Sequence, residues 1–156
     1  MLLLLFTAGR DRYAIAGAQI VEVIPYLQIE QRASLPELIP GIINYRSIPV
    51  PIVDLSLLLT DKPCRRRLST RIILTRYNAE NTAPPKSPSQ IVGLLAENVT
   101  ESVNVSKSGT CQTEGKETKP YGGKQYINAE EAGYNMLQIF DPGKLLPAAI
   151  LDNLVL

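Results

Sequence analysis

The sequence predicts an all-β fold of two small barrels packed around a shared core, with short helices. Two observations predict it. Short apolar runs recur along the chain between Gly, Pro, Asn and Asp residues, a pattern typical of short strands joined by turns. A strand-turn pattern also occurs twice in the same order, which indicates a duplicated unit. One copy alone would bury little apolar surface, whereas two copies packed together share a core.

The chain opens with an apolar run at residues 2–6. This run is too short to span a bilayer or to form the core of a signal peptide, so we expect it to be a buried first strand. Residues 13–16 predict the second strand. Residues 20–24 are too short to classify by period alone, and residues 26–29 are a candidate strand.

The clearest pattern predicts a hairpin followed by a short helix. Residues 41–45 and 48–53 form its two strands, and the tip between them exposes one cation, Arg46, on an apolar background. Asp54 is expected to cap the helix, because its carboxylate can accept hydrogen bonds from the free amides of the first turn. The leucines within residues 55–59 then predict a short apolar helix.

The second half of the chain alternates apolar runs with long polar segments. Residues 78–90 and 106–123 have the composition of mobile loops, and residues 142–155 predict a C-terminal helix interrupted by Pro147. The remaining apolar runs predict strands at residues 71–77, 91–95, 125–128 and 136–140, with a further strand marked by Val99, Val103 and Val105.

Two sets of residues repeat at identical spacing. The first pairs Val50, Ile52, Val53, Asp54, Leu58 and Leu59 with Leu137, Ile139, Phe140, Asp141, Leu145 and Leu146. The second pairs Tyr13, Ala14, Ile15, Ile20, Glu22 and Ile24 with Val92, Gly93, Leu94, Val99, Glu101 and Val103. We interpret Asp54 and Asp141 as helix caps and the two glutamates as equivalent surface caps. The repeat predicts one domain over residues 1–156, with a first barrel at about residues 1–68 and a second barrel plus the C-terminal helix at residues 69–156.

Composition argues against an enzyme. The chain has no histidine, which removes the commonest general base, the usual partner of a serine or cysteine nucleophile, and the usual zinc and haem ligands. Cys64 and Cys111 form no CxxC pair, so we expect free thiols in a reducing cytoplasm rather than a metal site or a disulfide framework. We therefore expect a cytoplasmic, non-enzymatic protein without metal or cofactor.

The formal net charge is +1, so the overall field attracts neither nucleic acid nor an anionic membrane. Arg65, Arg66 and Arg67 form one basic cluster, most simply interpreted as a solvated linker face. The alternative hypothesis is a small barrel that binds single-stranded nucleic acid through this cluster and Arg71. Such sites also need aromatic residues for stacking, and the chain has no Trp and only 2 Phe.

Five pieces of the chain resemble the CheW-like family, the coupling proteins of bacterial chemosensory arrays. The most specific are residues 41–46 (GIINYR), similar to the family's GVINLRG hairpin, and residues 50–55 (VPIVDL), similar to its VPVIDL strand. Residues 13–15 (YAI), 21–25 (VEVIP) and 92–95 (VGLL) also match family segments. The main departure is a serine at position 47, where the family usually has glycine, a residue that permits backbone angles that serine disfavours.

The resemblance implies two five-stranded SH3-like barrels and a function without chemistry. In the family, one barrel face docks on the CheW-like regulatory domain of a CheA-type histidine kinase. A groove between the barrels takes the helical hairpin of a methyl-accepting chemoreceptor, an ordinary mode of recognition. The resemblance thus implies a cytoplasmic adaptor that joins receptor to kinase, without nucleic acid as a partner and without inserting into the membrane.

Four positions correspond to the family's receptor-binding region, namely Arg46, Asn44, Gly41 and Ile20. Arg46 is the strongest candidate, because a planar guanidinium suits carboxylates and the carbonyls at a helix C-terminus. Asn44 is also explained as a turn residue, Gly41 by backbone geometry and Ile20 by core packing.

Overall fold

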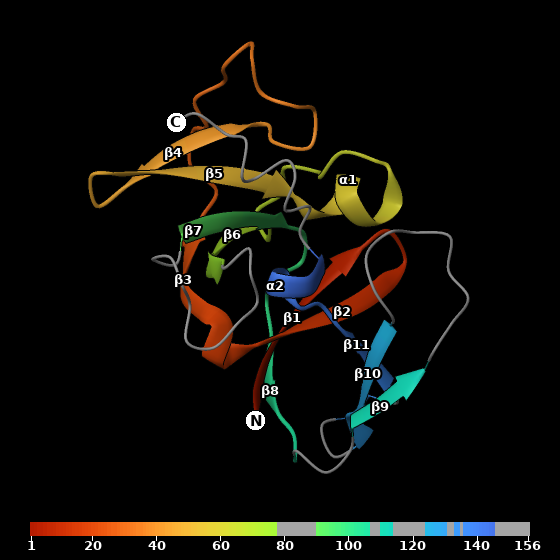
Figure 1. Ribbon diagram of the computed structural model, residues 1–156. Coiled ribbons are helices and arrows are strands. Elements are labelled where there is room, and N and C mark those ends of the chain that lie inside the picture. The colour runs from red at the N-terminus through yellow and green to blue at the C-terminus, as the bar shows by residue number, and fades with distance from the viewer. Residues whose placement is uncertain (78–89, 107–109, 114–123, 131–132, 135, 146–156) are drawn as a thin grey trace.

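The computed structural model describes residues 1–77, 90–106, 110–113, 124–130, 133–134 and 136–145. These residues are mostly strands, which confirms the all-β prediction (Figure 1). The strands are β1 (Leu2–Ala8), β2 (Asp11–Ala16), β3 (Ile20–Pro25), β4 (Gly41–Tyr45), β5 (Ile48–Asp54), β6 (Arg71–Tyr77), β7 (Gln90–Ala96), β8 (Ser102–Asn104), β9 (Thr110–Thr113), β10 (Lys124–Asn128) and β11 (Met136–Ile139). The helices are the 3-10 turn η1 (Gly17–Gln19), α1 (Leu55–Thr60) and α2 (Pro142–Leu145), and no helix in the described ranges is long and apolar enough to cross a membrane.

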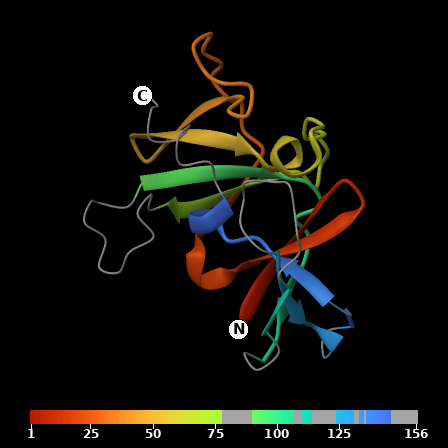
Figure 2. The ribbon, with the colours of Figure 1, turned by 45° about the vertical axis from the view of Figure 1, so that its right-hand side comes forward.

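The strands form two sheets that pack together (Figures 1 and 2). One sheet has five strands in the order β3-β6-β7-β5-β4, and the other has six in the order β8-β1-β2-β11-β10-β9. In the five-stranded sheet the chain continues beyond β3 to the far edge. There Glu30 and Ile42 exchange two backbone hydrogen bonds of 2.9 Å, and this bridge closes the sheet toward a barrel.

Four predicted segments differ from the structure or extend beyond it. Residues 26–29 form no strand. The strand β9 lies within residues 106–123, where a loop was expected, because its threonines and glutamine give no apolar signal. Residue 90 of the predicted loop at residues 78–90 begins β7, and the rest of that loop and the C-terminal helix beyond Leu145 lie outside the described residues.

The two copies of the repeat exchange a strand. Strand β5 of the first copy pairs in parallel with β7 of the second, with Ile52 opposite Gly93. Strand β11 of the second copy pairs in parallel with β2 of the first, with Ile139 opposite Ala14. Because the repeat aligns Ile52 with Ile139 and Gly93 with Ala14, the two pairs share one register, which supports the duplication.

This exchange corrects the expected division of the chain near residue 68. The five-stranded sheet uses strands from residues 20–96, whereas the six-stranded sheet combines strands from residues 2–16 and 102–139. The repeat identifies which strands are equivalent, but it does not determine which copy each strand pairs with. Neither sheet therefore belongs to one half of the sequence.

In the described part of the chain, the buried apolar side chains form three clusters, one packed on each sheet and one shared between the two sheets. Within the shared cluster the rings of Phe6 and Tyr13 stack at 5.4 Å, and Phe6 meets the edge of Phe140 at 6.1 Å. The shared cluster also contains Ile15, Val53, Ile73, Val92 and Leu94. The cluster of the six-stranded sheet includes Leu3, Leu5, Ala14, Ile127 and Leu137, and that of the five-stranded sheet includes Ile24, Val50, Ile52, Ile72 and Leu74.

Asp54 caps α1 as predicted. One carboxylate oxygen accepts a hydrogen bond of 3.1 Å from the amide of Leu57, and the other accepts one of 2.9 Å from the amide of Cys64. Burial raises the pKa of Asp54. Its counterpart Asp141 accepts a hydrogen bond of 3.0 Å from the amide of Gly143, in the first turn of α2. The two aspartates of the repeat therefore share one role, which is to cap the start of the helix that follows them.

The β4–β5 hairpin has a two-residue tip. Asn44 lies opposite Pro49 and Tyr45 opposite Ile48, which leaves Arg46 and Ser47 as the loop. Their φ angles are 49° and 63°, and positive φ at both central residues is the requirement of a type I′ turn. This turn usually takes Asn-Gly, so here it is built from two residues that disfavour its geometry.

The shared core predicts matching losses in the two repeats. Val53→Ala and Phe140→Ala should each lower the free energy of unfolding by about 2–4 kcal/mol, because each removes fully buried apolar volume. Chemical denaturation followed by circular dichroism measures the loss. Leu68→Ala is the control, since the Leu68 side chain is 97% exposed. This substitution should leave the free energy of unfolding unchanged. A negligible loss at Val53 or Phe140 would contradict equivalent core positions.

The turn geometry predicts that Ser47→Gly stabilises the protein by on the order of 1 kcal/mol. Glycine removes the steric cost of positive φ, which exceeds the entropy that it adds to the unfolded chain. Thermal and urea unfolding measure the gain. Ser34→Gly is the matched control, because Ser34 is exposed and is not among the positive-φ residues. It should be neutral or slightly destabilising, and equal effects of the two substitutions would refute strain at the tip.

Candidate functional site

Arg46 lies at the tip of the β4–β5 hairpin, but it is not the lone cation that the sequence suggested. Its Nη2 atom is 3.9 Å from Oε2 of Glu22, and its guanidinium carbon is 5.2 Å from the ring centroid of Tyr45. The Arg46 side chain nevertheless remains 77% exposed. The guanidinium is therefore oriented by two neighbours while most of its surface stays available to a partner.

Glu22 and Tyr45 connect the two edges of the five-stranded sheet. The Tyr45 hydroxyl donates a hydrogen bond to the Glu22 carboxylate, and this bond raises the pKa of Tyr45. Glu22 belongs to β3 and Tyr45 to β4, the first and last strands of the sheet. The contact thus joins the sheet edges at the tip of the hairpin, a second closure beside the Glu30–Ile42 bridge.

The other expected receptor-binding residues lie in different surroundings. Asn44 is exposed on β4. Ile20 is half-buried, packs against the shared core and begins β3, the strand that carries Glu22. Gly41 is buried at the far end of β4 from the tip, where a Cβ atom would lie 2.1 Å from Cγ2 of Ile29 and 2.4 Å from the carbonyl oxygen of Glu30. The structure thus explains the glycine at position 41 by the close approach of residues 29 and 30. It also brings Arg46 near Glu22, in the first half of β3.

The six-stranded sheet carries an equivalent cluster. Tyr134 donates a hydrogen bond to Glu101, and the guanidinium carbon of Arg12 lies 4.9 Å from the Tyr134 ring centroid. That hydrogen bond raises the pKa of Tyr134. Glu22 and Glu101 occupy matching positions of the repeat, so both are acceptors for a tyrosine from a neighbouring hairpin. The sequence repeat marked the two glutamates but not their tyrosine and arginine partners.

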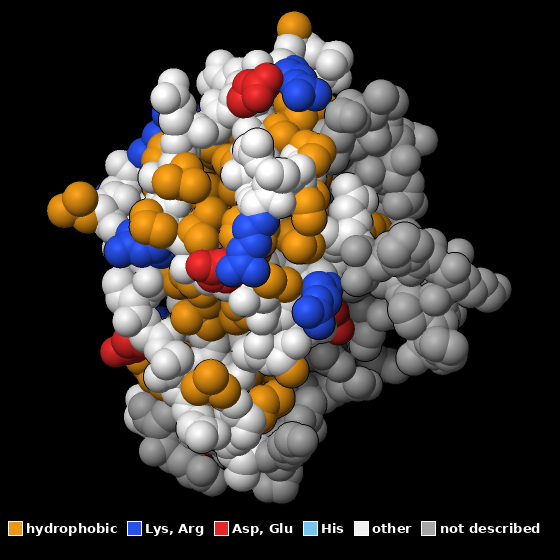
Figure 3. Space-filling view, turned by 90° about the vertical axis from the view of Figure 1, so that its left-hand side faces the viewer, with side chains coloured by type: hydrophobic (Ala, Val, Ile, Leu, Met, Phe, Trp, Pro, Cys, Tyr) orange, Lys and Arg blue, Asp and Glu red, His pale blue; other side chains and the backbone are white. Residues whose placement is uncertain are grey.

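Apolar side chains surround the hairpin tip. The face that carries this tip and β3 shows hydrophobic side chains gathered around a basic and an acidic group that touch (Figure 3). Val23 and Ile48, the sequence neighbours of Glu22 and Ser47, are 39% and 49% exposed. A cation set in an apolar surround is suited to an amphipathic helix, whose charged and apolar faces meet along one edge.

The basic cluster behind the nucleic-acid hypothesis is partly engaged within the protein. The guanidinium carbon of Arg66 lies 5.2 Å from the ring centroid of Tyr26. Arg71 donates hydrogen bonds to the carbonyls of Leu68 and Thr70. Two of the four arginines invoked by that hypothesis therefore face protein groups.

The described residues show no cluster of side chains suited to binding a metal ion, and their one characterised thiol is unreactive. Among them no three His, Cys, Asp or Glu side chains cluster as metal ligands would. Burial raises the pKa of Cys64 to about 12, so its thiol stays protonated at neutral pH, and the thiolate is the nucleophilic form.

Comparisons with known proteins identify the family of the chain. The profile of the CheW-like domain family matches residues 2–149. The chain is 25% identical over 154 residues to the chemotaxis protein CheW of Klebsiella aerogenes, covering 96% of this chain and 86% of that protein. Its fold is similar to the crystal structure of the scaffolding protein TtCheW from Thermoanaerobacter tengcongensis, with a TM-score of 0.71, 18% identity, and coverage of 94% and 87%. Because the family profile spans nearly the whole chain, the protein belongs to the CheW-like family of non-catalytic chemotaxis scaffolds.

Proposed function

We propose that this protein is a cytoplasmic adaptor that joins the cytoplasmic tip of a chemoreceptor to the regulatory domain of a CheA-type histidine kinase. Membership of the CheW-like family supports a scaffolding role in chemotaxis. The observation that carries the receptor half of the proposal is Arg46, a highly exposed guanidinium on a two-residue turn.

The surroundings of Arg46 favour recognition over a role in stability. An exposed ion pair such as Arg46–Glu22 contributes little to folding, yet Tyr45 and Glu22 restrict where the guanidinium can point. A side chain that is already oriented loses less entropy when it binds a carboxylate or the carbonyls at a helix C-terminus. The exposed side chains of Val23 and Ile48 would then cover the apolar face of the receptor helix.

The two-barrel architecture gives the adaptor separate faces for its two partners. In this proposal the receptor helix lies against the first half of β3, which carries Ile20 and Glu22, and against the β4–β5 hairpin, whose Tyr45 is hydrogen-bonded to Glu22. The kinase regulatory domain, itself CheW-like, docks on another barrel face. A substitution confined to the hairpin tip should therefore affect one partner and spare the other.

This separation gives a test with a matched control. Arg46→Gln should weaken binding to a purified receptor hairpin fragment by on the order of tenfold, the effect expected when an interface arginine is truncated. Binding to the kinase regulatory domain should stay unchanged. Arg12→Gln is the control, because Arg12 also lies over a tyrosine ring but in the other sheet; it should leave receptor binding unaltered.

Isothermal titration calorimetry with the two fragments measures both affinities, and the unfolding midpoint of each variant reports its stability. The midpoint of Arg46→Gln should move by the equivalent of less than about 0.5 kcal/mol. An equal loss of both partners would show that Arg46 supports the fold instead of one interface. Unchanged binding to both partners would remove Arg46 from the receptor site.

A further inference from the structure

The loop that follows α1, residues 64–68, is held in place by two carboxylates. Asp54 accepts a hydrogen bond of 2.9 Å from the amide of Cys64, and Glu97 accepts one of 2.7 Å from the amide of Arg65. Asp54 precedes α1 and Glu97 follows β7. The first part of the loop is therefore tied to the two strands that the repeats exchange, β5 and β7.

The second part of the same loop is organised by Thr70, which is fully buried. Its hydroxyl donates a hydrogen bond of 2.6 Å to the carbonyl of Arg65 and accepts one of 3.0 Å from the amide of Arg67. Its own amide donates a 3.0 Å hydrogen bond to the carbonyl of Arg67. The backbone of the loop is thus fixed at both ends.

The side chains of this ordered loop are turned outward. Arg65, Arg66 and Arg67 are exposed, and Leu68 is 97% exposed. An apolar side chain in water adds nothing to folding, and exposed arginines contribute little. A rigid loop that presents such side chains is typical of a binding surface.

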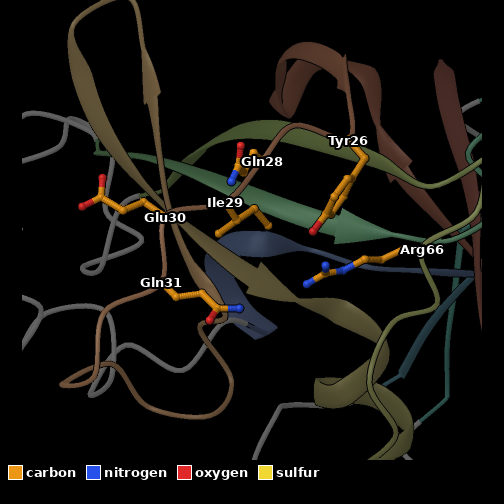
Figure 4. Close-up of a pocket in the computed structure, with 6 residues that line it drawn as sticks. All are labelled: Tyr26, Gln28, Ile29, Glu30, Gln31 and Arg66. Carbon is orange, nitrogen blue, oxygen red and sulfur yellow. The ribbon is translucent and has the colours of Figure 1, made fainter.

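Arg66 also lines a pocket of about 610 Å³, together with Tyr26, Gln28, Ile29, Glu30 and Gln31. The Tyr26 ring and the Arg66 side chain extend toward one another, whereas Glu30 points away from them (Figure 4). Glu30 lies 3.5 Å from Arg32, so its charge is countered outside the pocket. Neither ion pair recorded among the described residues involves Arg66, which leaves its guanidinium as the uncompensated charge of the pocket.

The backbone beside the pocket is suited to an extended peptide. Glu30 directs both its amide and its carbonyl to Ile42 of β4. This pairing places Glu30 beside β4, at the edge of the five-stranded sheet. Gln28 and Gln31 add carboxamides that can both donate and accept hydrogen bonds. Main-chain pairing with side-chain contacts at alternate positions is how sheet edges bind peptides.

We propose that this pocket and the adjoining loop of residues 64–68 bind an acidic, extended segment of a partner protein. The Arg66 guanidinium, oriented by Tyr26, binds a carboxylate of the segment through paired hydrogen bonds. The glutamines of the pocket bind its peptide groups, and the neighbouring arginines and Leu68 contact the residues that flank the carboxylate. The site is separate from the proposed receptor contact, because Arg46 precedes β5 and the loop follows the helix at its other end.

Charge and stacking favour a protein segment over other anions. The net charge of +1 provides no long-range attraction to a polyanion. The Tyr26 ring already carries Arg66 on it, so it offers less of its surface to a stacked base, which binding of single strands requires. One exposed leucine buries too little area to hold a membrane surface.

The full-length protein is titrated into a fluorescein-labelled peptide of alternating glutamate and valine, and binding is followed by fluorescence anisotropy. Arg66→Gln should weaken binding by on the order of tenfold, as expected for loss of a bidentate contact. Arg10→Gln, which removes an exposed arginine from the turn between β1 and β2, should not change the affinity. Gln31→Lys, which adds a cation to the same pocket, should tighten binding and guards against a loss caused by misfolding.

Three results would overturn the proposal. The first is equal binding of a peptide in which lysine replaces glutamate. The second is an equal loss for Arg66→Gln and Arg10→Gln, which would indicate general charge attraction. The third is tighter binding, dependent on Arg66, to an oligothymidylate or to phosphatidylglycerol vesicles than to the acidic peptide. Receptor and kinase binding should be unaffected by Arg66→Gln, so failure here is distinct from failure of the adaptor proposal.

Discussion

The fold depends on two parallel strand pairs, β5 with β7 and β11 with β2. Each joins one copy of the repeat to the other, so neither sheet can form from one copy alone. Between β5 and β7 there is no room for a side chain at position 93, because a Cβ atom on Gly93 would lie 2.4 Å from Cδ1 of Ile52. The shared core of Val53, Phe140 and their neighbours follows from this exchange, since both strands continue directly into it.

The same exchange places the candidate binding residues. Pairing of β5 with β7 positions the β4–β5 hairpin at the edge of the five-stranded sheet, and the Tyr45–Glu22 hydrogen bond ties the hairpin to β3. At the other end of β5, Asp54 organises both the start of α1 and the loop that carries Arg66. One strand therefore positions two chemically different surfaces at its two ends.

Much of this architecture could be predicted from the sequence. Strand positions, the aspartate caps and the two-barrel class follow from local patterns, and the CheW-like resemblance rested on contiguous motifs such as residues 50–55. The pairing partners could not be predicted, because a repeat shows equivalence and not exchange. The contact between Glu22 and Tyr45 was hidden for the same reason, since it exists only when the first and last strands of a sheet meet. Ser47 marked an unusual turn, but its positive φ is a property of the folded hairpin.

The exchange of strands also bears on the order in which a growing chain can fold. A ribosome releases β1 and β2 first, yet their further partners, β8 and β11, belong to residues 102–139. The five-stranded sheet needs only residues 20–96. It can therefore form while the β1–β2 hairpin still lacks its partners β8 and β11. During that interval the leucine-rich β1 has an open edge, the kind of surface that pairs with other chains. The strand order thus lets the middle of the chain fold before its two ends are joined, and it leaves the first segment made as the last to find all its partners.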